Sequence, residues 1–145
     1  MKAKQLTIFI ENREGRLEEV LSILTKNNIN IKSLSLADTE DFGLLRMIVS
    51  NPDLGKEKLT EAGFSTTISE VVIVEIDNKC GSLAQLLKLL KENNINIEYM
   101  YGLNISKDKG SIVLKATPVD MILNVLKKNN FKLYSDEDVA GIDKK

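Results

Sequence analysis

The chain has 145 residues, a net charge of -1 and 43% hydrophobic residues, so it can bury a core and lacks the basic signature of a nucleic-acid-binding protein. It contains no histidine, which excludes Ser-His-Asp and Cys-His catalysis and histidine-based zinc sites. It has no phosphate-binding glycine loop, no apolar run of membrane-spanning length and a single cysteine, Cys80, so we expect a cytoplasmic protein without a cofactor, membrane segment or internal disulfide.

The first elements along the chain are a strand, a helix and a second strand. Residues 6–12 are rich in β-forming side chains and end in a polar turn. The next apolar residues recur at i, i+3, i+4 and i+7, which predicts one apolar stripe on a helix. The stripe consists of Leu17, Val20, Leu21 and Leu24. Asn27 and Asn28 would end this helix, because asparagine tolerates the left-handed conformation at a helix C-terminus, and residues 29–38 would form the next strand.

A further strand, helix and strand complete the first half. Gly43 is expected in a short turn before a strand at residues 44–50. Asn51 is a candidate N-cap with Pro52 at the first helical position, where a missing N–H costs nothing. The last strand of this half is predicted to begin at Phe64.

The second half repeats the first at an offset of 66 residues. Eleven of the 22 positions in residues 10–31 are identical to those in residues 76–97. A strand is predicted at 71–78, and the helix that follows carries a second apolar stripe. This stripe consists of Leu83, Leu86, Leu87 and Leu90. Asn93 and Asn94 would end this helix as their counterparts do in the first copy.

The remaining elements of the second copy follow the same plan. Strands are expected at residues 95–104 and 111–117, with Gly110 in the turn between them. Thr117 is the candidate N-cap of the next helix, with Pro118 at its first position. The stripe of that helix consists of Met121, Ile122, Val125 and Leu126.

These elements predict a duplicated α+β fold. A last strand begins at Phe131, and the acidic tail at residues 135–145 is expected to be partly loose. The order β-α-β-β-α-β, found twice, predicts two tandem ferredoxin-like units at residues 1–70 and 71–145. Each should have an antiparallel sheet with both helices on one face, and the absence of a linker favours packing of the units side by side.

Two similar loops join the first strand and first helix of each copy. They read "ENREGRL" and "DNKCGSL". Gly15 and Gly81 permit an unusual φ at the helix start, where unpaired N–H groups and the helix dipole favour a carboxylate. Asn12 and Asn78 precede the turn, and an asparagine amide can hold both an ammonium and a carboxylate. Alternatively, these asparagines only shape the turn.

The pattern Asn-x-x-Gly-x-Leu, a leucine stripe and Asn-Ile-Asn-Ile within β-α-β-β-α-β resembles the ACT domain family in both copies. The segment "ENREG" is similar to the loop of the serine-sensing domain of phosphoglycerate dehydrogenase. ACT domains are small regulatory modules of amino-acid metabolism that bind amino acids, usually between two ACT units. The resemblance therefore implies an allosteric amino-acid site between the two copies.

The resemblance also implies which residues bind the effector. The loop asparagine and the asparagine before the second strand's isoleucine contact the ligand in the family, and they correspond here to Asn12 and Asn78, and to Asn30 and Asn96. The full set of implied ligand-binding residues is Asn12, Arg13, Glu14, Gly15, Arg16, Leu17, Asn30, Ile31, Asn78, Lys79, Cys80, Gly81, Ser82, Leu83, Asn96 and Ile97.

Two features depart from the family pattern. The residue before the glycine is commonly proline but is here Glu14 or Cys80, and a histidine that precedes the loop in some members is replaced by Ile10 and Ile76. Cys80 has no histidine base, so an inert thiol is expected. Tyr99 and its neighbours could line a ligand pocket or cover a protein interface, and the sequence leaves both open.

The resulting functional prediction is a non-catalytic sensor that binds a free amino acid and acts on a separate metabolic enzyme or regulator. The alternative is a ligand-free ferredoxin-like module for protein–protein interaction. An RNA-binding domain of this topology would need exposed aromatics on the strands around residues 44–50 and 111–117, which are absent, and no paired acids suggest an enzyme. A homodimer that covers exposed strand edges is a further expectation.

Overall fold

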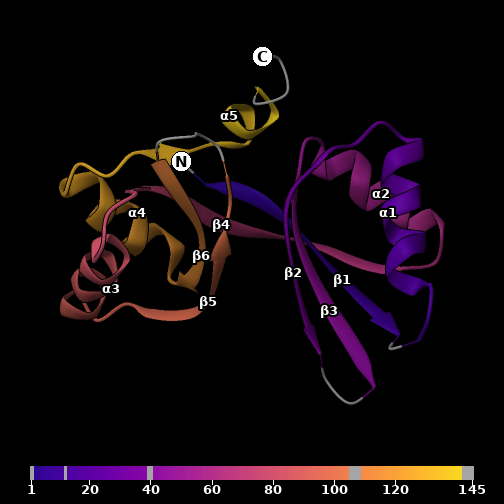
Figure 1. The fold of residues 1–145 in the computed structure, drawn as a ribbon, viewed down its shortest axis with the longest axis horizontal. Helices are drawn as coiled ribbons and strands as arrows, with labels where there is room; N and C mark the ends of the chain where they lie inside the picture. Colours follow the sequence, from indigo (N-terminus) through magenta and orange to yellow (C-terminus); the bar gives the residue numbers. More distant parts are fainter. Residues whose placement is uncertain (1, 12, 39–40, 105–108, 142–145) are drawn as a thin grey trace. The chain divides into compact units, whose positions relative to one another are not determined.

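The structure, a computed structural model, describes residues 2–11, 13–38, 41–104 and 109–141. Its elements follow one another along the chain as the repeat predicts (Figure 1). They are β1 (Ala3–Glu11), α1 (Arg16–Lys26), β2 (Ile31–Asp38), β3 (Phe42–Val49), α2 (Pro52–Glu61), β4 (Ser65–Asp77), α3 (Ser82–Glu92), β5 (Asn96–Gly102), β6 (Lys109–Thr117), α4 (Val119–Lys128), β7 (Leu133–Tyr134) and α5 (Asp136–Gly141). The last strand of the first copy and the first strand of the second form the single strand β4.

The chain divides into two compact units. The N-terminal unit is Lys4–Ser69, and the C-terminal unit is Glu70–Lys145 together with Met1–Ala3. Within the C-terminal unit, the Lys2 ammonium lies 3.0 Å from a carboxylate oxygen of Glu70 and 3.1 Å from one of Asp120. The predicted boundary between residues 70 and 71 and the side-by-side packing of the units stay predictions.

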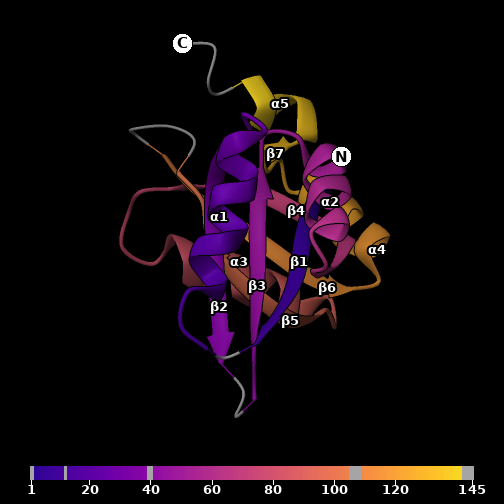
Figure 2. The ribbon, with the colours of Figure 1, turned by 90° about the vertical axis from the view of Figure 1, so that its right-hand side faces the viewer.

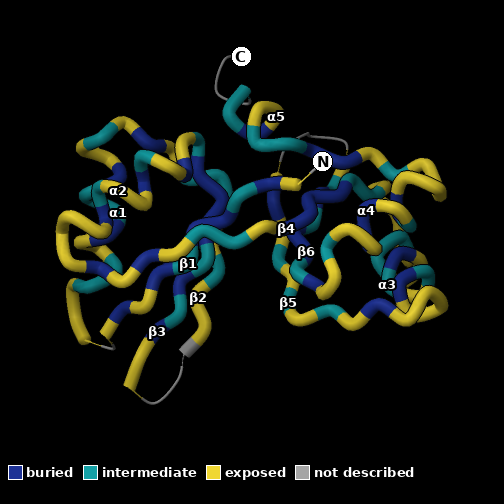
Figure 3. Tube along the Cα trace, turned by 180° about the vertical axis from the view of Figure 1, so that it is seen from behind, coloured by how far each residue is buried: buried dark blue, intermediate teal, exposed yellow. Residues whose placement is uncertain are grey.

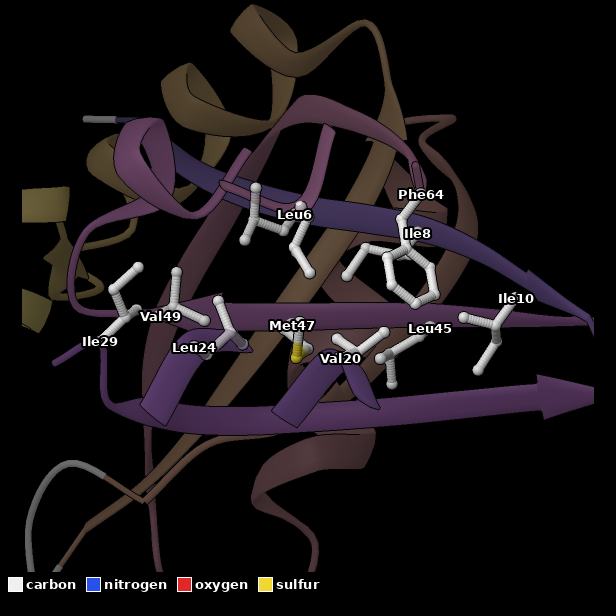
Figure 4. Packing of buried hydrophobic residues seen from close by; sticks show 11 residues of the cluster. Leu6, Ile8, Ile10, Val20, Leu24, Ile29, Leu45, Met47, Val49 and Phe64 are labelled. Carbon is white, nitrogen blue, oxygen red and sulfur yellow. The ribbon is translucent and has the colours of Figure 1, made fainter. Parts of the chain in front are cut away.

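The N-terminal unit has the strand order β2-β3-β1-β4. Strand β3 runs antiparallel to both β1 and β2, with Leu6 opposite Met47 in the first pair. Residues of β1 and β3 share one buried cluster with residues of α1 and α2, so both helices cover the same face of the sheet (Figures 2 and 4). Figure 4 shows Val20 and Leu24 of α1 packed toward Met47. The predicted stripe of α1 therefore faces the core, with Val20 and Leu24 fully buried.

The C-terminal unit repeats this arrangement: its strand order is β5-β6-β4-β7, which corresponds to β2-β3-β1-β4. Strand β4 is antiparallel to β6, with Val72 opposite Leu114. Leu86 and Leu90 of α3 and Ile122 of α4 are fully buried in one cluster with these strands. The prediction of antiparallel sheets with helices on one face is confirmed for each unit.

Within the described residues, asparagine pairs follow α1, α3 and α4, as predicted for α1 and α3. Asn28, Asn94 and Asn130 have φ values of 59°, 58° and 62°, in the left-handed region that asparagine tolerates better than most side chains. The next N–H bonds back to the helix, as when Ile29 N donates to the Leu24 carbonyl at 2.9 Å. This geometry satisfies carbonyl groups that the helix end would leave unpaired.

The N-cap prediction is confirmed for α2 and wrong for α4. Asn51 accepts a hydrogen bond from the Leu54 N–H through its side chain. Thr117 instead ends β6, Pro118 is the N-cap with an extended backbone, and the Thr117–Pro118 peptide bond is cis. The Thr117 hydroxyl donates to a Glu98 carboxylate oxygen at 2.7 Å, and no side chain makes a cap hydrogen bond at the start of α4 within the described residues.

The two turn glycines lie within strands rather than turns. Strands β3 and β6 begin before Gly43 and Gly110. A Cβ at Gly43 would lie 3.2 Å from side-chain atoms of Ile10 and Leu36, and one at Gly110 would lie 3.2 Å from Ile76 Cγ1. A larger residue at either position would have to displace a neighbouring side chain by a few tenths of an ångström, so the close packing over the backbone favours glycine.

Part of the acidic tail, which was expected to be partly loose, forms a helix. Residues 136–141 form α5, and Val139 is buried. The Ser135 backbone N–H donates to Asp138, and the Asp138 N–H donates to the Ser135 hydroxyl, which is the reciprocal pattern of a capping box. Residues 142–145 lie outside the described part of the chain.

Candidate functional site

The two loops share one backbone design at the start of α1 and α3. Gly15 has φ 85° and ψ -12°, and Gly81 has φ 88° and ψ -6°. Both are N-cap residues in the left-handed region, and a Cβ at either would meet no atom within 4 Å. The glycines are therefore required by backbone conformation and not by lack of space, which explains why the motif keeps glycine in both copies.

The two helix starts are uncapped by side chains within the described part of the chain. The Glu19 N–H donates to the Gly15 carbonyl and the Gln85 N–H to the Gly81 carbonyl, each at 3.0 Å. The first turn of α1 carries Glu18 and Glu19, whereas that of α3 carries no acidic residue. The positive end of the α3 dipole is thus the less neutralised of the two, and it is the better place for a ligand carboxylate.

The first loop contains charged side chains that contact one another. Asn12 lies outside the described residues. Arg13 Nε lies 3.3 Å from a Glu11 carboxylate oxygen, and both side chains are exposed. Glu14 and Gly15 are exposed, whereas Leu17 packs against the core of the N-terminal unit.

The second loop is open to solvent. Asn78, Lys79 and Cys80 are exposed, and the Cys80 thiol is free. Before the loop, Asp77 accepts a hydrogen bond from the Lys109 ammonium, and this contact lowers the pKa of the Asp77 carboxyl below its usual value. After the loop, Ser82 is half-buried at the first position of α3, and Leu83 packs against the core of the C-terminal unit.

The strand asparagines lie where the alternation of the sequence placed them. Ile29 and Ile95 are buried, while Ile31 and Ile97 pack partly buried against the cores of their own units. Asn30 and Asn96 are exposed between these isoleucines. The Asn30 carbonyl accepts a hydrogen bond from the Ser50 N–H at 2.9 Å. Exposed and half-buried residues alternate along β5 from Asn96 onward, including Tyr99 and Tyr101 on the half-buried side (Figure 3).

The described part of the C-terminal unit contains a pocket of about 320 Å³ beside the second loop. Segments from β4, α3, β6 and the turn between α4 and β7 meet there. Its lining residues are Glu75, Ile76, Asp77, Ser82, Gln85, Lys109, Asn129, Asn130, Phe131 and Lys132. We call this the Phe131 pocket. Of these residues only Ser82 was predicted from the sequence as a site residue, because the others lie outside the family motif.

The wall of the Phe131 pocket contains as many acidic as basic side chains. Glu75 and Asp77 supply two carboxylates, and Lys109 and Lys132 supply two ammonium groups. Such a wall has partners for both ends of a dipolar molecule, so it suits a zwitterion better than a simple anion or cation.

Tyr134 lies next to one of these carboxylates. Its hydroxyl donates to Glu75 at 2.9 Å, and the Lys132 ammonium lies 5.1 Å from its ring centroid. Burial raises the pKa of the Tyr134 hydroxyl from 10.0 to about 12, and the hydrogen bond to Glu75 and its negative charge act in the same direction. The neutral phenol is therefore favoured in the folded protein.

This shift predicts a loss of stability at alkaline pH. Because the pKa of Tyr134 is higher in the folded than in the unfolded state, its contribution is complete below pH 10 and declines as pH rises toward 12. Between pH 9 and pH 11 the loss should be about 1 kcal/mol. Urea unfolding should show that Tyr134→Phe lacks this part of the decline. Tyr99→Phe, which keeps Tyr134, should retain it; equal slopes for Tyr134→Phe and the unchanged protein would contradict the assignment.

Neither a metal centre nor a membrane segment emerges from the described residues. No group of three or more histidine, cysteine, aspartate or glutamate residues among them could hold a metal ion. None of the helices traced there is both long and apolar enough to cross a membrane.

Comparison with known proteins points to one family. The sequence matches the ACT domain pair over residues 1–142. It is 25% identical over 120 residues to the acetolactate synthase small subunit of Buchnera aphidicola, covering 81% of this chain and 74% of that one. A crystal structure of a protein from Bacteroides thetaiotaomicron is similar, with 38% identity, a TM-score of 0.91 and coverage of 97% and 96% of the two chains.

A more distant structure shares the fold. The ligand-free regulatory subunit of aspartate kinase from Thermus thermophilus has a TM-score of 0.64 and 14% identity, and the match covers 86% of this chain and 90% of that subunit. At this identity the likeness shows the fold alone.

Proposed function

Because the chain belongs to the ACT domain family, we propose that it is a non-catalytic regulatory protein that binds a free amino acid and controls a separate metabolic enzyme. The observation that carries the proposal is the paired loop design. Each copy has a left-handed glycine before a helix whose first turn no side chain caps within the described residues. Such a helix start offers N–H groups and a positive dipole to a carboxylate.

The proposed binding mode uses both charges of an amino acid. The ligand carboxylate would accept hydrogen bonds from N–H groups at the start of α1 or α3, and asparagine amide oxygens would accept them from the ammonium. Asn12 and Asn78 are the loop candidates, and Asn30 and Asn96 are the strand candidates. By analogy with the family, we propose that each site lies between the two ACT units, with a loop from one copy and a strand from the other.

The two loops should bind the amino-acid ligand with unequal affinity. Glu18 and Glu19 in the first turn of α1 would repel a ligand carboxylate, and α3 has no counterpart of these charges. The side chains before the glycines also differ, since Glu14 in the first loop corresponds to Cys80 in the second. We therefore propose that the second loop is the tighter site.

The names of similar proteins support a separate enzyme as the partner. One is the small subunit of acetolactate synthase, and another is a regulatory subunit of aspartate kinase. Both names describe a subunit that accompanies an enzyme. By analogy, this chain would carry the ligand-sensing role while its partner carries catalysis.

A thermal-shift screen against each of the twenty amino acids tests this function. A ligand that binds only the folded state must raise the unfolding temperature, and at a hundredfold excess over its Kd it adds about 2.7 kcal/mol of stability. One amino acid or a few related ones should produce a clear rise, and the D-enantiomer of each should produce less. If no amino acid shifts the transition, the ligand-free interaction module becomes the better account.

A further inference from the structure

The N-terminal unit has an arginine at the place that corresponds to the Phe131 pocket. The Arg16 guanidinium carbon lies 4.3 Å from the centroid of the Phe64 ring. One guanidinium N–H of Arg16 donates to Glu19 Oε2 at 2.7 Å, and the Arg16 side chain is only 18% exposed. The guanidinium is thus held between an aromatic face and a carboxylate, both of which stabilise a cation.

The starts of α1 and α3 are equivalent in backbone structure. Arg16 and Ser82 are the first residues of α1 and α3. The Glu19 and Gln85 N–H groups bond to the carbonyl of the preceding left-handed glycine at the same distance of 3.0 Å.

The aromatic residues match in the same way. The Phe64 N–H donates to the Leu59 carbonyl, and the Phe131 N–H donates to the Leu126 carbonyl, each at 3.0 Å. Both hydrogen bonds close the turn after the second helix of their unit. Phe64 and Phe131 therefore have equivalent positions in the two copies.

The second copy keeps the aromatic residue and lacks the cation. Ser82 stands where Arg16 stands, and Gln85 where Glu19 stands. Phe64 is 4% exposed under Arg16, whereas Phe131 is half-buried and lines an open pocket together with Ser82 and Gln85. The replacement of a long side chain by serine accounts for the space.

We propose that the Phe131 pocket binds a small metabolite through a guanidinium group that stacks on Phe131 as Arg16 stacks on Phe64. A pocket of about 320 Å³ lies at the lower end of the range for ligand sites, which is roughly 300–1,000 Å³, and suits a molecule the size of a single amino acid. The site lies within the C-terminal unit beside the second loop, with which it shares Ser82; its other lining residues are not among the effector residues proposed above.

The wall of the pocket indicates how such a metabolite would be oriented. The Gln85 side-chain oxygen and the Ser82 hydroxyl can accept hydrogen bonds from a guanidinium near the ring. Glu75 and Asp77 add two carboxyl groups to the wall, and each already has a hydrogen-bonding partner. Lys132 and Lys109 would attract a carboxylate at the other end of the ligand. The chemical class is therefore a guanidinium-bearing amino acid.

An NMR titration of the intact chain tests the cation requirement. Ethylguanidinium should shift the amide signals of residues 82–85 and 131, and ethylurea, its neutral isostere, should bind at least about tenfold more weakly. L-Arginine should likewise exceed L-citrulline. Because ethylguanidinium has no carboxylate, this result does not depend on the amino-acid sensor function. Equal binding of ethylguanidinium and ethylurea would overturn the proposal.

Two variants of α3 test the location. Gln85→Glu restores the carboxylate that Glu19 provides in the first copy, so it should tighten ethylguanidinium binding several-fold. Lys91→Gln, on the exposed surface of the last turn of α3, makes the same change in net charge away from the pocket and should have little effect. If both variants change the affinity equally, the pocket is not the binding site.

Filling the pocket from within gives the complementary result. The double variant Ser82→Arg, Gln85→Glu recreates the Arg–Glu pair over Phe131, and ethylguanidinium binding should disappear while the circular dichroism spectrum stays unchanged. Phe131→Leu keeps apolar volume but removes the aromatic face, so it should weaken binding of the cation specifically. Retained full affinity in a folded double variant would refute the assignment.

Discussion

Replacing Leu24 with alanine is expected to lower the free energy of unfolding by about 2–5 kcal/mol. Leu24 is fully buried where α1 meets the sheet of the N-terminal unit, and its removal leaves a cavity in a cluster that includes Met47 and Leu59. Leu90 holds the same position in the C-terminal unit and is also fully buried. Leu90→Ala should therefore cost a similar amount.

Urea unfolding followed by circular dichroism measures both effects. Lys88→Ala, an exposed change in α3, is the control and should alter stability by less than about 0.5 kcal/mol. A loss of less than about 1 kcal/mol for Leu24→Ala would contradict the position of α1 against the sheet, because a well-packed leucine cannot be truncated at so small a cost.

The elements of this fold could be predicted because their signals are local. Leucine stripes at helical spacing, isoleucines at alternate strand positions and asparagine pairs after helices each depend on a few neighbouring residues. Because the chain repeats itself, each element predicted in one copy was supported by the corresponding residues of the other copy. Asn51 followed this logic, since its side chain caps an N–H only three residues away.

Predictions failed at residues whose structural role depends on contacts with residues far away in the sequence. Thr117 precedes a proline as Asn51 does, but its hydroxyl bonds to Glu98, 19 residues earlier, across neighbouring strands. Gly43 and Gly110 look like turn residues in sequence, yet both lie within strands, where side chains from other strands pack close to their backbone. In the tail, by contrast, the spacing of Ser135 and Asp138 was a local signal of a helix start that could have been used.

The Phe131 pocket could not be predicted from one copy. Its lining comes from four separate segments, and no short motif joins them. The available signal was a difference between the copies: Arg16 and Glu19 become Ser82 and Gln85 while the phenylalanine is kept. Comparing what a duplicated chain changes is thus as informative here as comparing what it repeats.

The loop asparagines should have large effects on effector binding. If the Asn78 amide holds a charged group of the ligand, Asn78→Ala should cost about 1.5–3 kcal/mol, which is roughly tenfold to a hundredfold in Kd. Asn12→Ala should do the same at the other site. Asn78 is exposed, so its truncation should leave the free energy of unfolding nearly unchanged. Lys91→Ala, at an exposed position remote from both loops in sequence, serves as the control for binding.

Isothermal titration calorimetry of the unchanged protein and the variant Asn12→Ala, Asn78→Ala, with the amino acid identified by the screen, tests the central claim most directly. The account predicts saturable binding to the unchanged protein. It also predicts binding at least tenfold weaker to the folded double variant, by the same hydrogen-bond loss. Undiminished affinity in a double variant whose unfolding curve matches that of the unchanged protein would contradict the claim that these two loops form the amino-acid sites.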